Sequence, residues 1–322
     1  MLYHYCSVEK CYSILKGQNL RLSDIKKSND YQELGLFFPG IILELETQYN
    51  EMENPFFFVY RGLTGEQAMS QLTLYLYDIW KKQFEQGTFS DYVVCFSEDP
   101  DSLGQWRGYA NNACGCSIGF SKELLEQYCL NTGRIIELQK VEYKTQAEIQ
   151  DLIKNSARDL LNQISTMRSE IALSIYHDDD GEADPRIDPI FEARVNMILQ
   201  SVFIKSLRYK SIGFMEEKEW RMFFTTAPSR NPKWLLNERD ALWGSYKSTR
   251  DFVLSRIDFM PTENDLVSFC PISFNDTEFS ENPIKEIWLG PKNRIVEDDI
   301  NAFLQIHKYD GVTVHHSDIT YR

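Results

Sequence analysis

The chain has 322 residues, of which 43% are hydrophobic and 13% aromatic. This composition supports a sizeable folded core and excludes a disordered chain. The net charge of −14 opposes attachment to nucleic acid or to an anionic membrane over a broad surface, although it leaves room for a local basic cleft.

The start of the chain has no signal-peptide pattern, because Met1–His4 lacks a basic region followed by an apolar stretch. No apolar run has the length needed to cross a bilayer. The seven cysteines lack the spacing of a disulfide framework, which favours a reducing compartment. We therefore expect a cytoplasmic protein without a membrane segment. Cys6/Cys11 and Cys114/Cys116 are only a weak zinc signal, so we expect no metal.

The first third of the chain predicts strands that alternate with helices. Ser7 and Gly17 are typical cap and stop residues of the first helix. Residues 24–63 are expected to be irregular, because Asn29-Asp30 and Pro39-Gly40 indicate turns. The predicted elements are strands at Leu2–Cys6, Asn19–Ser23 and Tyr92–Ser97, and helices at Val8–Lys16, Thr64–Gln86 and Ser102–Ala110.

The rest of the chain predicts strands dispersed among helices, without the regular alternation of a parallel sheet. Strands are predicted at Cys114–Phe120, Arg134–Tyr143, 217–225, Asp251–Phe259, Leu266–Phe274, Ile284–Gly290 and Gly311–His316. Helices are predicted at Lys122–Leu130, Gln146–Tyr176, Pro189–Tyr209 and Glu297–His307, with an acidic loop over 177–182. We expect one α+β domain over residues 1–322, in which residues 145–210 form a helical insertion or cap.

The most chemically loaded stretch is Glu217-Lys218-Glu219-Trp220-Arg221, at the head of an apolar run with strand composition. Side chains alternate along a strand, so Glu217, Glu219 and Arg221 are expected to share one face. In a cleft, two carboxylates and a guanidinium this close shift one another's pKa values, as catalytic groups do. On a solvated face the same groups are an ion-paired network with a structural role.

Two further stretches place polar side chains on or beside strands. His4 lies in the first strand, where a satisfied buried histidine is the ordinary alternative to a ligand. Ser97 ends a Cys-Phe-Ser strand, and its hydroxyl can equally cap the following helix. Trp106 and Tyr109 are three residues apart on that helix and are expected to share a face, which is more often core than a binding surface.

These stretches together resemble a widespread bacterial family of unknown function over nearly the whole chain. The motifs that carry the resemblance are Leu2-Tyr3-His4-Tyr5, Cys95-Phe96-Ser97-Glu98, Trp106-Arg107-Gly108-Tyr109-Ala110, Glu217-Lys218-Glu219-Trp220-Arg221 and Ile284-Lys285-Glu286-Ile287-Trp288-Leu289-Gly290, with Asn29-Asp30. The order of elements is in turn remotely similar to the ADP-ribosyltransferase fold. This similarity implies split mixed β-sheets, with NAD as a substrate.

The similarity also implies a role for each of three side chains. His4 is expected to hold the ribose on the adenosine side of NAD, and Ser97 to orient the catalytic carboxylate. Glu217 or Glu219 is expected to be that carboxylate, and the choice between them stays open. These groups must then converge on one pocket of dinucleotide size.

Four more residues would complete such an NAD site. Trp106 and Tyr109 would pack against nicotinamide or adenine, and Arg107 or Arg221 would pair with the pyrophosphate. A carboxylate near the ribose stabilises the positive charge that develops when the nicotinamide bond breaks. The ADP-ribose would pass to water or to a macromolecular acceptor, either protein or nucleic acid.

The resemblance further implies a toxin or phage-defence effector, with a partner protein from the same operon. Lys205 is expected to neutralise one of the two glutamates.

Two other functions stay open. Glu216 and Lys218 form a Glu-x-Lys pair on the predicted strand which, with Asp30, would bind Mg²⁺ and activate water in a nuclease. The acidic balance of the chain offers no evident phosphate-binding surface for that reaction. A non-catalytic nucleotide or peptide sensor would use the same cleft as the transferase.

Overall fold

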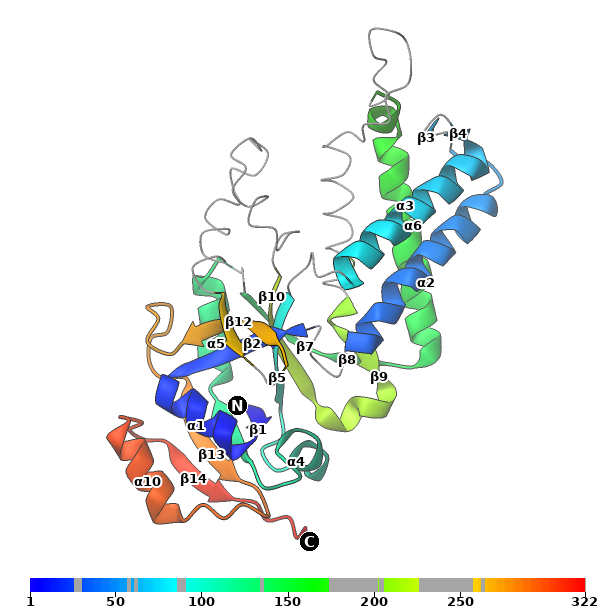
Figure 1. Cartoon of the computed structure of the whole chain (residues 1–322). Helices are drawn as coiled ribbons and strands as arrows, with labels where there is room; N and C mark the ends of the chain where they lie inside the picture. The colour runs from blue at the N-terminus through cyan, green and yellow to red at the C-terminus, as the bar shows by residue number, and fades with distance from the viewer. Residues whose placement is uncertain are drawn as a thin grey trace.

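A computed structural model of the chain describes residues 1–25, 31–56, 59–60, 63–85, 91–133, 136–173, 202, 206–225, 257–261 and 264–321. Its main element is a ten-stranded sheet with both antiparallel and parallel pairs, with helices around it (Figure 1). The fold is therefore α+β, as the sequence predicts.

The sheet runs in the order β11-β12-β2-β5-β1-β6-β13-β14, and β10 lies between β5 and β7. Its strands are β1 (Leu2–Cys6), β2 (Asn19–Asp24), β5 (Asp91–Ser97), β6 (Cys116–Phe120), β7 (Ile136–Lys140), β10 (Glu219–Thr225), β11 (Asp258–Pro261), β12 (Leu266–Ser273), β13 (Ile284–Leu289) and β14 (Thr313–His316). A two-stranded parallel pair, β8 (Glu142–Lys144) and β9 (Tyr209–Ser211), lies outside this sheet.

The sheet divides at β5. β10 pairs with β5 along its whole length, from Glu219 opposite Ser97 to Thr225 opposite Asp91. β2 pairs with the beginning of β5, whereas β1 pairs with its end, where Tyr3 lies opposite Ser97. β2 and β1 therefore pair with different parts of β5, and the end of β5 that carries Ser97 pairs with β1 and β10.

Alternation of side chains along these strands builds two different faces. One face carries Phe96 and Met222 into the main core, which α1 (Val8–Gly17), α5 (Lys122–Asn131) and α10 (Glu297–Ile306) cover. The other face carries Tyr3 and Tyr5 against Trp106 of α4 (Leu103–Tyr109).

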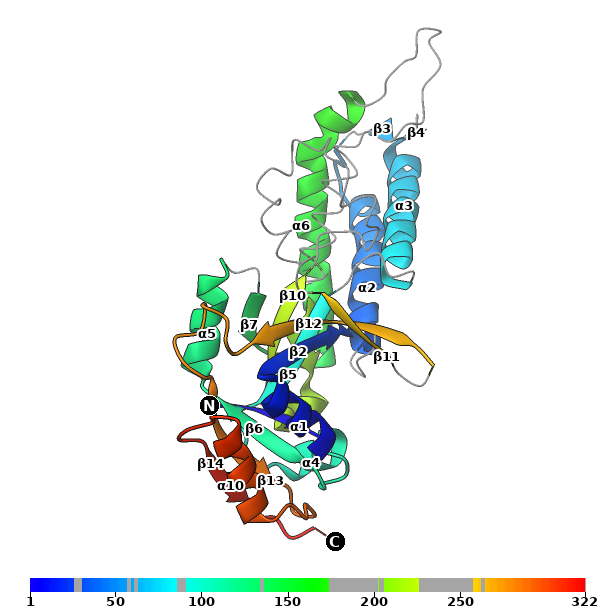
Figure 2. The same ribbon diagram turned by 60° about the vertical axis from the view of Figure 1, so that its left-hand side comes forward.

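A separate helical unit packs at one end of the sheet. It consists of α2 (Tyr31–Asn50), α3 (Gly65–Glu85) and α6 (Gln146–Leu173), which share their own cluster of buried apolar side chains. A short hairpin, β3 (Val59–Tyr60) and β4 (Leu63–Thr64), precedes α3. Figures 1 and 2 both show the three helices side by side, at the end opposite to α10 and β14. The helical unit therefore extends beyond the predicted insertion at 145–210, because α2 and α3 also belong to it.

The expectation of an irregular segment over residues 24–63 is wrong for residues 31–50, which form α2, whereas residues 51–56 have no regular structure. α2 runs through Pro39 and Gly40, and its buried residues Ile41, Leu45 and Tyr49 pack on α3 and α6. Burial of this stripe against two neighbouring helices outweighs the local cost of Pro and Gly in a helix.

Three other predictions need correction or lie outside the described residues. The strand predicted over Arg134–Tyr143 divides into β7 and β8. The strand predicted over residues 217–225 begins only at Glu219, after the 3-10 helix η2 (Ile212–Glu217). Asn29-Asp30, the acidic loop, Lys205, residues 251–256 and most of the helix predicted over Pro189–Tyr209 fall on residues that the structure does not describe.

None of the seven cysteines, all of which lie in the described residues, forms a disulfide bond. Cys6, Cys11 and Cys116 are buried together in the main core. A hydrogen bond with Cys11, together with burial, raises the pKa of the Cys116 thiol well above its usual range, so it stays protonated. Among the described helices, none is long and apolar enough to cross a membrane.

Candidate functional site

The local backbone brings Glu217 and Glu219 together by a turn. η2 ends at Glu217, and Lys218 adopts a left-handed conformation with φ of 46° before β10 begins at Glu219. Glu217 is therefore not on the strand, and the predicted alternation holds only for Glu219 and Arg221. Both carboxylates nevertheless contact one cation, Lys210 of β9.

Lys210 is the centre of the site. Its Nζ lies 2.6 Å from Oε2 of Glu217 and 3.2 Å from Oε2 of Glu219. The Lys210 side chain is only 1% exposed, and its ammonium also lies over the ring of Phe214, 4.8 Å from the centroid. A buried lysine needs such partners, because an isolated charge in the interior is strongly unfavourable.

Glu219 forms the buried half of the site with Arg221. Nε of Arg221 lies 2.7 Å from Oε1 of Glu219, and Nη2 lies 3.2 Å from Oε2, which is the two-pronged geometry that guanidinium favours. Nη1 of Arg221 donates to the carbonyl of Leu207. Burial by itself raises the pKa of the Glu219 carboxyl. The charges of Arg221 and Lys210, with hydrogen bonds from Arg221 and Cys95, outweigh it and hold that pKa below its ordinary value.

Glu217 forms the accessible half of the site. Its side chain is 14% exposed, and the hydroxyl of Tyr109 donates to its Oε1 over 3.1 Å. The two rings beside it, Tyr109 and Phe214, are 42% and 41% exposed. Leu103 of α4 and Met215 of η2 are also exposed, and these two elements contact each other. A carboxylate with a fixed orientation thus lies among exposed aromatic and apolar side chains.

Ser97 belongs to the same region but is already engaged. Its hydroxyl donates to the backbone carbonyl of Glu217 over 2.7 Å and accepts from the backbone amide of Asp99 over 3.1 Å. The hydroxyl does not cap α4, which begins after Ser102. Ser97 therefore holds the end of η2 against the end of β5, and it fixes the Glu217 backbone and not its carboxylate.

His4 does not join the other predicted residues, which corrects the expected convergence on one pocket. Tyr3 and Glu219 both lie opposite Ser97, so Ser97 and Glu219 face the side of the sheet opposite to His4. The His4 ring packs edge-on against Phe96, and its Nδ1 lies 3.0 Å from the carbonyl of Cys95. Burial lowers the pKa of His4 to about 4, so the ring is neutral and satisfies a backbone carbonyl where β1 and β5 separate.

Trp106 and Arg107 also lie apart from the site. Trp106 is fully buried, packs edge-on against Tyr5 and donates to Oδ1 of Asp101 over 2.6 Å, so it cannot stack on a ligand. Arg107 is exposed and lies over the ring of Tyr321, 6.0 Å from the centroid. Trp106 and Tyr109 are three residues apart on α4, but Trp106 is buried, whereas Tyr109 is exposed and reaches Glu217, so only Tyr109 is open to a ligand.

The residues proposed for a magnesium nuclease have a different setting. Glu216 lies on η2, next to Gly104 of α4, and not on a strand. Lys218 forms an exposed ion pair with Asp99, with Nζ and Oδ2 3.3 Å apart. Among the described residues no group of three or more His, Cys, Asp or Glu side chains could hold a metal ion.

Lys210 is not among the residues predicted from the sequence, which favours Lys205 for the neutralising role and a helix end at Tyr209. The signal was the pair of glutamates itself, since two carboxylates near an apolar strand need a buried cation in addition to Arg221. Tyr143 is also absent from the predicted site residues. Its hydroxyl accepts from the Glu219 backbone amide over 2.7 Å, and burial raises its pKa to about 12.

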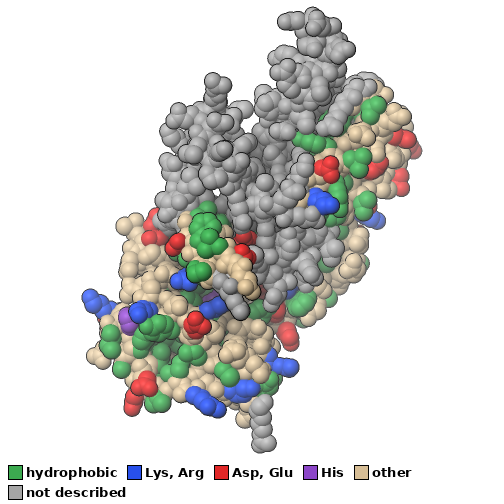
Figure 3. All heavy atoms as spheres, viewed as in Figure 1, with side chains coloured by type: hydrophobic (Ala, Val, Ile, Leu, Met, Phe, Trp, Pro, Cys, Tyr) green, Lys and Arg blue, Asp and Glu red, His purple; other side chains and the backbone are tan. Residues whose placement is uncertain are grey.

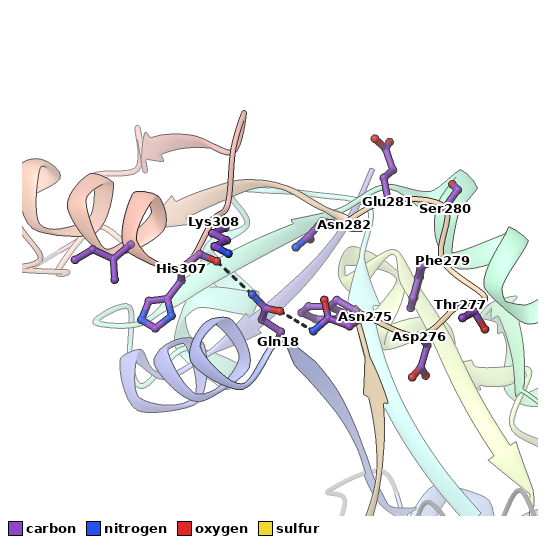
Figure 4. Close-up of a pocket in the computed structure, with 12 residues that line it drawn as sticks. Gln18, Asn275, Asp276, Thr277, Phe279, Ser280, Glu281, Asn282, His307 and Lys308 are labelled. Atoms are coloured by element: carbon purple, nitrogen blue, oxygen red, sulfur yellow. Dashed lines mark hydrogen bonds between the residues drawn. The ribbon is translucent and has the colours of Figure 1, made fainter.

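Two cavities with clear linings lie away from this site. One, of about 710 Å³, is formed by Gln18, the loop 274–282 and the end of α10. Figure 4 shows that Gln18 occupies its centre, where its amide donates to the His307 carbonyl and accepts from Asn275. These two hydrogen bonds of the Gln18 amide join three segments of the chain. The other cavity, of about 660 Å³, lies between α1 and the segment after β13.

The fold and the site together define an α+β protein with a buried Lys-Glu-Glu-Arg centre, of which one carboxylate is accessible. Residues 105–222 match the model of a family described as "Protein of unknown function (DUF2971)". This match agrees with the expected resemblance to a family of unknown function over residues 105–222, a segment that includes Tyr109, Lys210 and Glu217–Arg221. Neither the comparison with curated proteins nor that with solved structures gives a match.

Proposed function

We propose that this protein acts on the bond between nicotinamide and ribose in NAD, with Glu217 as the carboxylate that faces the ribose. The bond between the nicotinamide nitrogen and C1′ of the ribose breaks, and its electron pair leaves with nicotinamide. Water or a macromolecular acceptor then adds to C1′ and loses a proton. A toxin or phage-defence role stays a prediction that rests on the family resemblance alone.

One observation carries the proposal: the Glu217 carboxylate is accessible and is held from two sides. Lys210 fixes one of its oxygens at 2.6 Å and Tyr109 the other at 3.1 Å. A fixed carboxylate costs little reorganisation when positive charge develops on a ribose beside it. The exposed rings of Tyr109 and Phe214 are suited to pack against a planar base.

The groups around Glu217 differ from the expected triad of His4, Ser97 and a glutamate. Glu219 is buried and forms ion pairs with Arg221 and Lys210. This favours Glu217 as the residue that contacts the ligand. His4 and Ser97 have structural contacts in place of the ligand contacts expected of them.

The same contacts favour a second candidate, a sensor that binds a nucleotide at Glu217 without turnover. Two of the three groups expected to work on the substrate are occupied by backbone partners, whereas the aromatic rim for binding is present.

Release of nicotinamide from NAD by the purified protein, followed by chromatography, tests both candidates. In the enzyme, Glu217→Gln lowers the rate by about 100-fold or more, because an uncharged amide no longer stabilises the developing charge. Glu216→Gln is the matched control, because its carboxylate lies over Gly104 and outside the Lys210 contacts, and it leaves the rate unchanged.

The outcomes separate the candidates. A melting shift with NAD that Glu217→Gln abolishes, without nicotinamide release, supports the sensor. Turnover that survives Glu217→Gln contradicts the assignment of the carboxylate. Neither turnover nor a melting shift in the wild-type protein refutes both candidates.

A further inference from the structure

The cavity between α1 and the segment after β13 has the composition of a binding site. It has a volume of about 660 Å³, within the range of small-ligand pockets. Its lining consists of Val8, Cys114, Lys292, Asn293, Arg294 and Ile295. The lining thus combines two cations with an apolar wall, and none of these six residues is acidic.

The positive charge extends beyond the cavity. Lys292 and Arg107 both lie over the ring of Tyr321, at 4.7 and 6.0 Å from its centroid. Within the part of the chain that the structure describes, Arg107, Lys292 and Arg294 form no ion pair with a carboxylate. Figure 3 shows Lys and Arg side chains at the lower end of the molecule, where Figure 1 places α4 and the C-terminus. In a chain with a net charge of −14, Arg107, Lys292 and Arg294 thus form a local group of cations, although Figure 3 also shows Asp and Glu side chains at this end.

The backbone that carries the two cations is rigid. The Asn293 amide donates to the carbonyls of Cys114 and Gly115 over 3.0 and 2.8 Å. The backbone amide of Lys292 donates to the carbonyl of Ala113 over 2.9 Å. The segment 290–293 is thereby fastened to the turn before β6, so the backbone that carries the two basic side chains is held in place before any ligand arrives.

We infer that this cavity binds a phosphate ester of a nucleotide, with Lys292 and Arg294 on the phosphate and Val8 and Ile295 against the sugar or base. Guanidinium and ammonium groups are the usual phosphate partners. The exposed Val8 and the partly buried Ile295 offer apolar contact at one side of the cations. The inference does not rest on the function proposed for Glu217, because no residue of that site lines the cavity.

Calorimetric titration of the full chain with ADP, pyrophosphate and adenosine tests the inference. We expect ADP and pyrophosphate to bind, adenosine to bind much more weakly, and affinity to fall as salt rises. Lys292→Gln with Arg294→Gln weakens ADP binding by about tenfold or more, since two charged contacts to the phosphate are lost. The matched control is Lys154→Gln with Arg158→Gln, a change of equal charge at two exposed positions of α6.

A short single-stranded oligonucleotide distinguishes the two sources of this phosphate. Tighter binding with oligonucleotide length indicates a nucleic-acid strand, whereas binding of ADP alone indicates a free nucleotide. The inference is overturned if the wild-type protein binds none of the probes at millimolar concentration, or if both double variants lose affinity equally. It is also overturned if Glu217→Gln removes ADP binding while the Lys292/Arg294 variant keeps it, which places ADP at the other site.

Discussion

At the scale of single residues, Lys210 decides whether the buried carboxylates are tolerated. Its side chain is 1% exposed, and its ammonium forms ion pairs with both Glu217 and Glu219. We predict that Lys210→Met destabilises the protein by about 3 kcal/mol or more, because it leaves the buried Glu219 with less compensation. Urea unfolding at neutral pH measures this free energy.

The variant Lys218→Met is the control for Lys210→Met. Lys218 forms a surface ion pair with Asp99, and its side chain is 52% exposed. Lys218→Met is expected to cost less than about 1 kcal/mol. Equal losses in the two variants would show that Lys210 is not specially required. Part of the loss should return when Glu217→Gln is added to Lys210→Met, because the coupled pair is then removed together.

His4 gives the fold a pH dependence of known sign. Its pKa is about 4 in the folded protein against 6.5 ordinarily, so between these values the unfolded chain binds a proton that the folded protein does not. Stability from this residue is complete above pH 6.5 and falls as the pH drops towards 4, by up to about 1.4 kcal/mol per pH unit. We predict that His4→Gln reduces the slope of unfolding free energy against pH in this window.

Denaturant unfolding of wild-type and His4→Gln protein across this pH range makes the comparison. His316→Gln provides the control, because this histidine is 58% exposed. If both variants keep the wild-type slope, the neutral buried state of His4 is refuted.

At the scale of elements, the joint between β1, β6 and β13 depends on close backbone contact. A Cβ on Gly115 would lie 2.1 Å from the carbonyl oxygen of Cys6. We predict that Gly115→Ala costs about 3 kcal/mol or more, because backbone on both sides must move. Gly108 of α4 has no neighbouring atom within 4 Å of such a Cβ, so Gly108→Ala should stabilise by about 0.5–1 kcal/mol.

Thermal melting of the two glycine variants checks this pair. The same chemical change should move the melting temperature in opposite directions. A loss at Gly108 equal to that at Gly115 would contradict the close packing assigned to the joint.

At the scale of the whole molecule, the sheet and the helical unit have separate cores. Ile41 and Leu45 are fully buried among α2, α3 and α6, whereas the sheet buries a different set of side chains. We predict that Leu45→Ala costs about 2–5 kcal/mol of local stability through the cavity that it leaves. Hydrogen exchange should then quicken in α2, α3 and α6 and stay nearly unchanged in β1 and β6.

Leu43 gives the control for this prediction. It lies on the same helix with 71% of its surface exposed, so Leu43→Ala should leave the exchange rates almost unchanged. Faster exchange in the sheet of the Leu45→Ala protein would show that the two cores unfold as one unit.

Several elements could be predicted from the sequence alone, because their signals are local. The first strand, the capped helix after it and the long helix before β5 follow from period and cap residues. The pairing of Glu219 with Arg221 follows from strand alternation. α2 was missed because its Pro39-Gly40 pair indicates a turn, while the packing that keeps it helical comes from α3 and α6.

The sequence by itself thus determined the α+β class, most element bounds and the stretch that carries the charged centre. The tertiary structure decided which residues meet there. It placed His4 on the opposite face through strand register, buried Trp106, and supplied Lys210 from a segment that the sequence analysis placed next to a helix end. The physical reason is that caps and periodicity act between neighbours in the chain. The partner of a buried charge comes from wherever the sheet pairing and the turn at Lys218 bring one within about 3 Å.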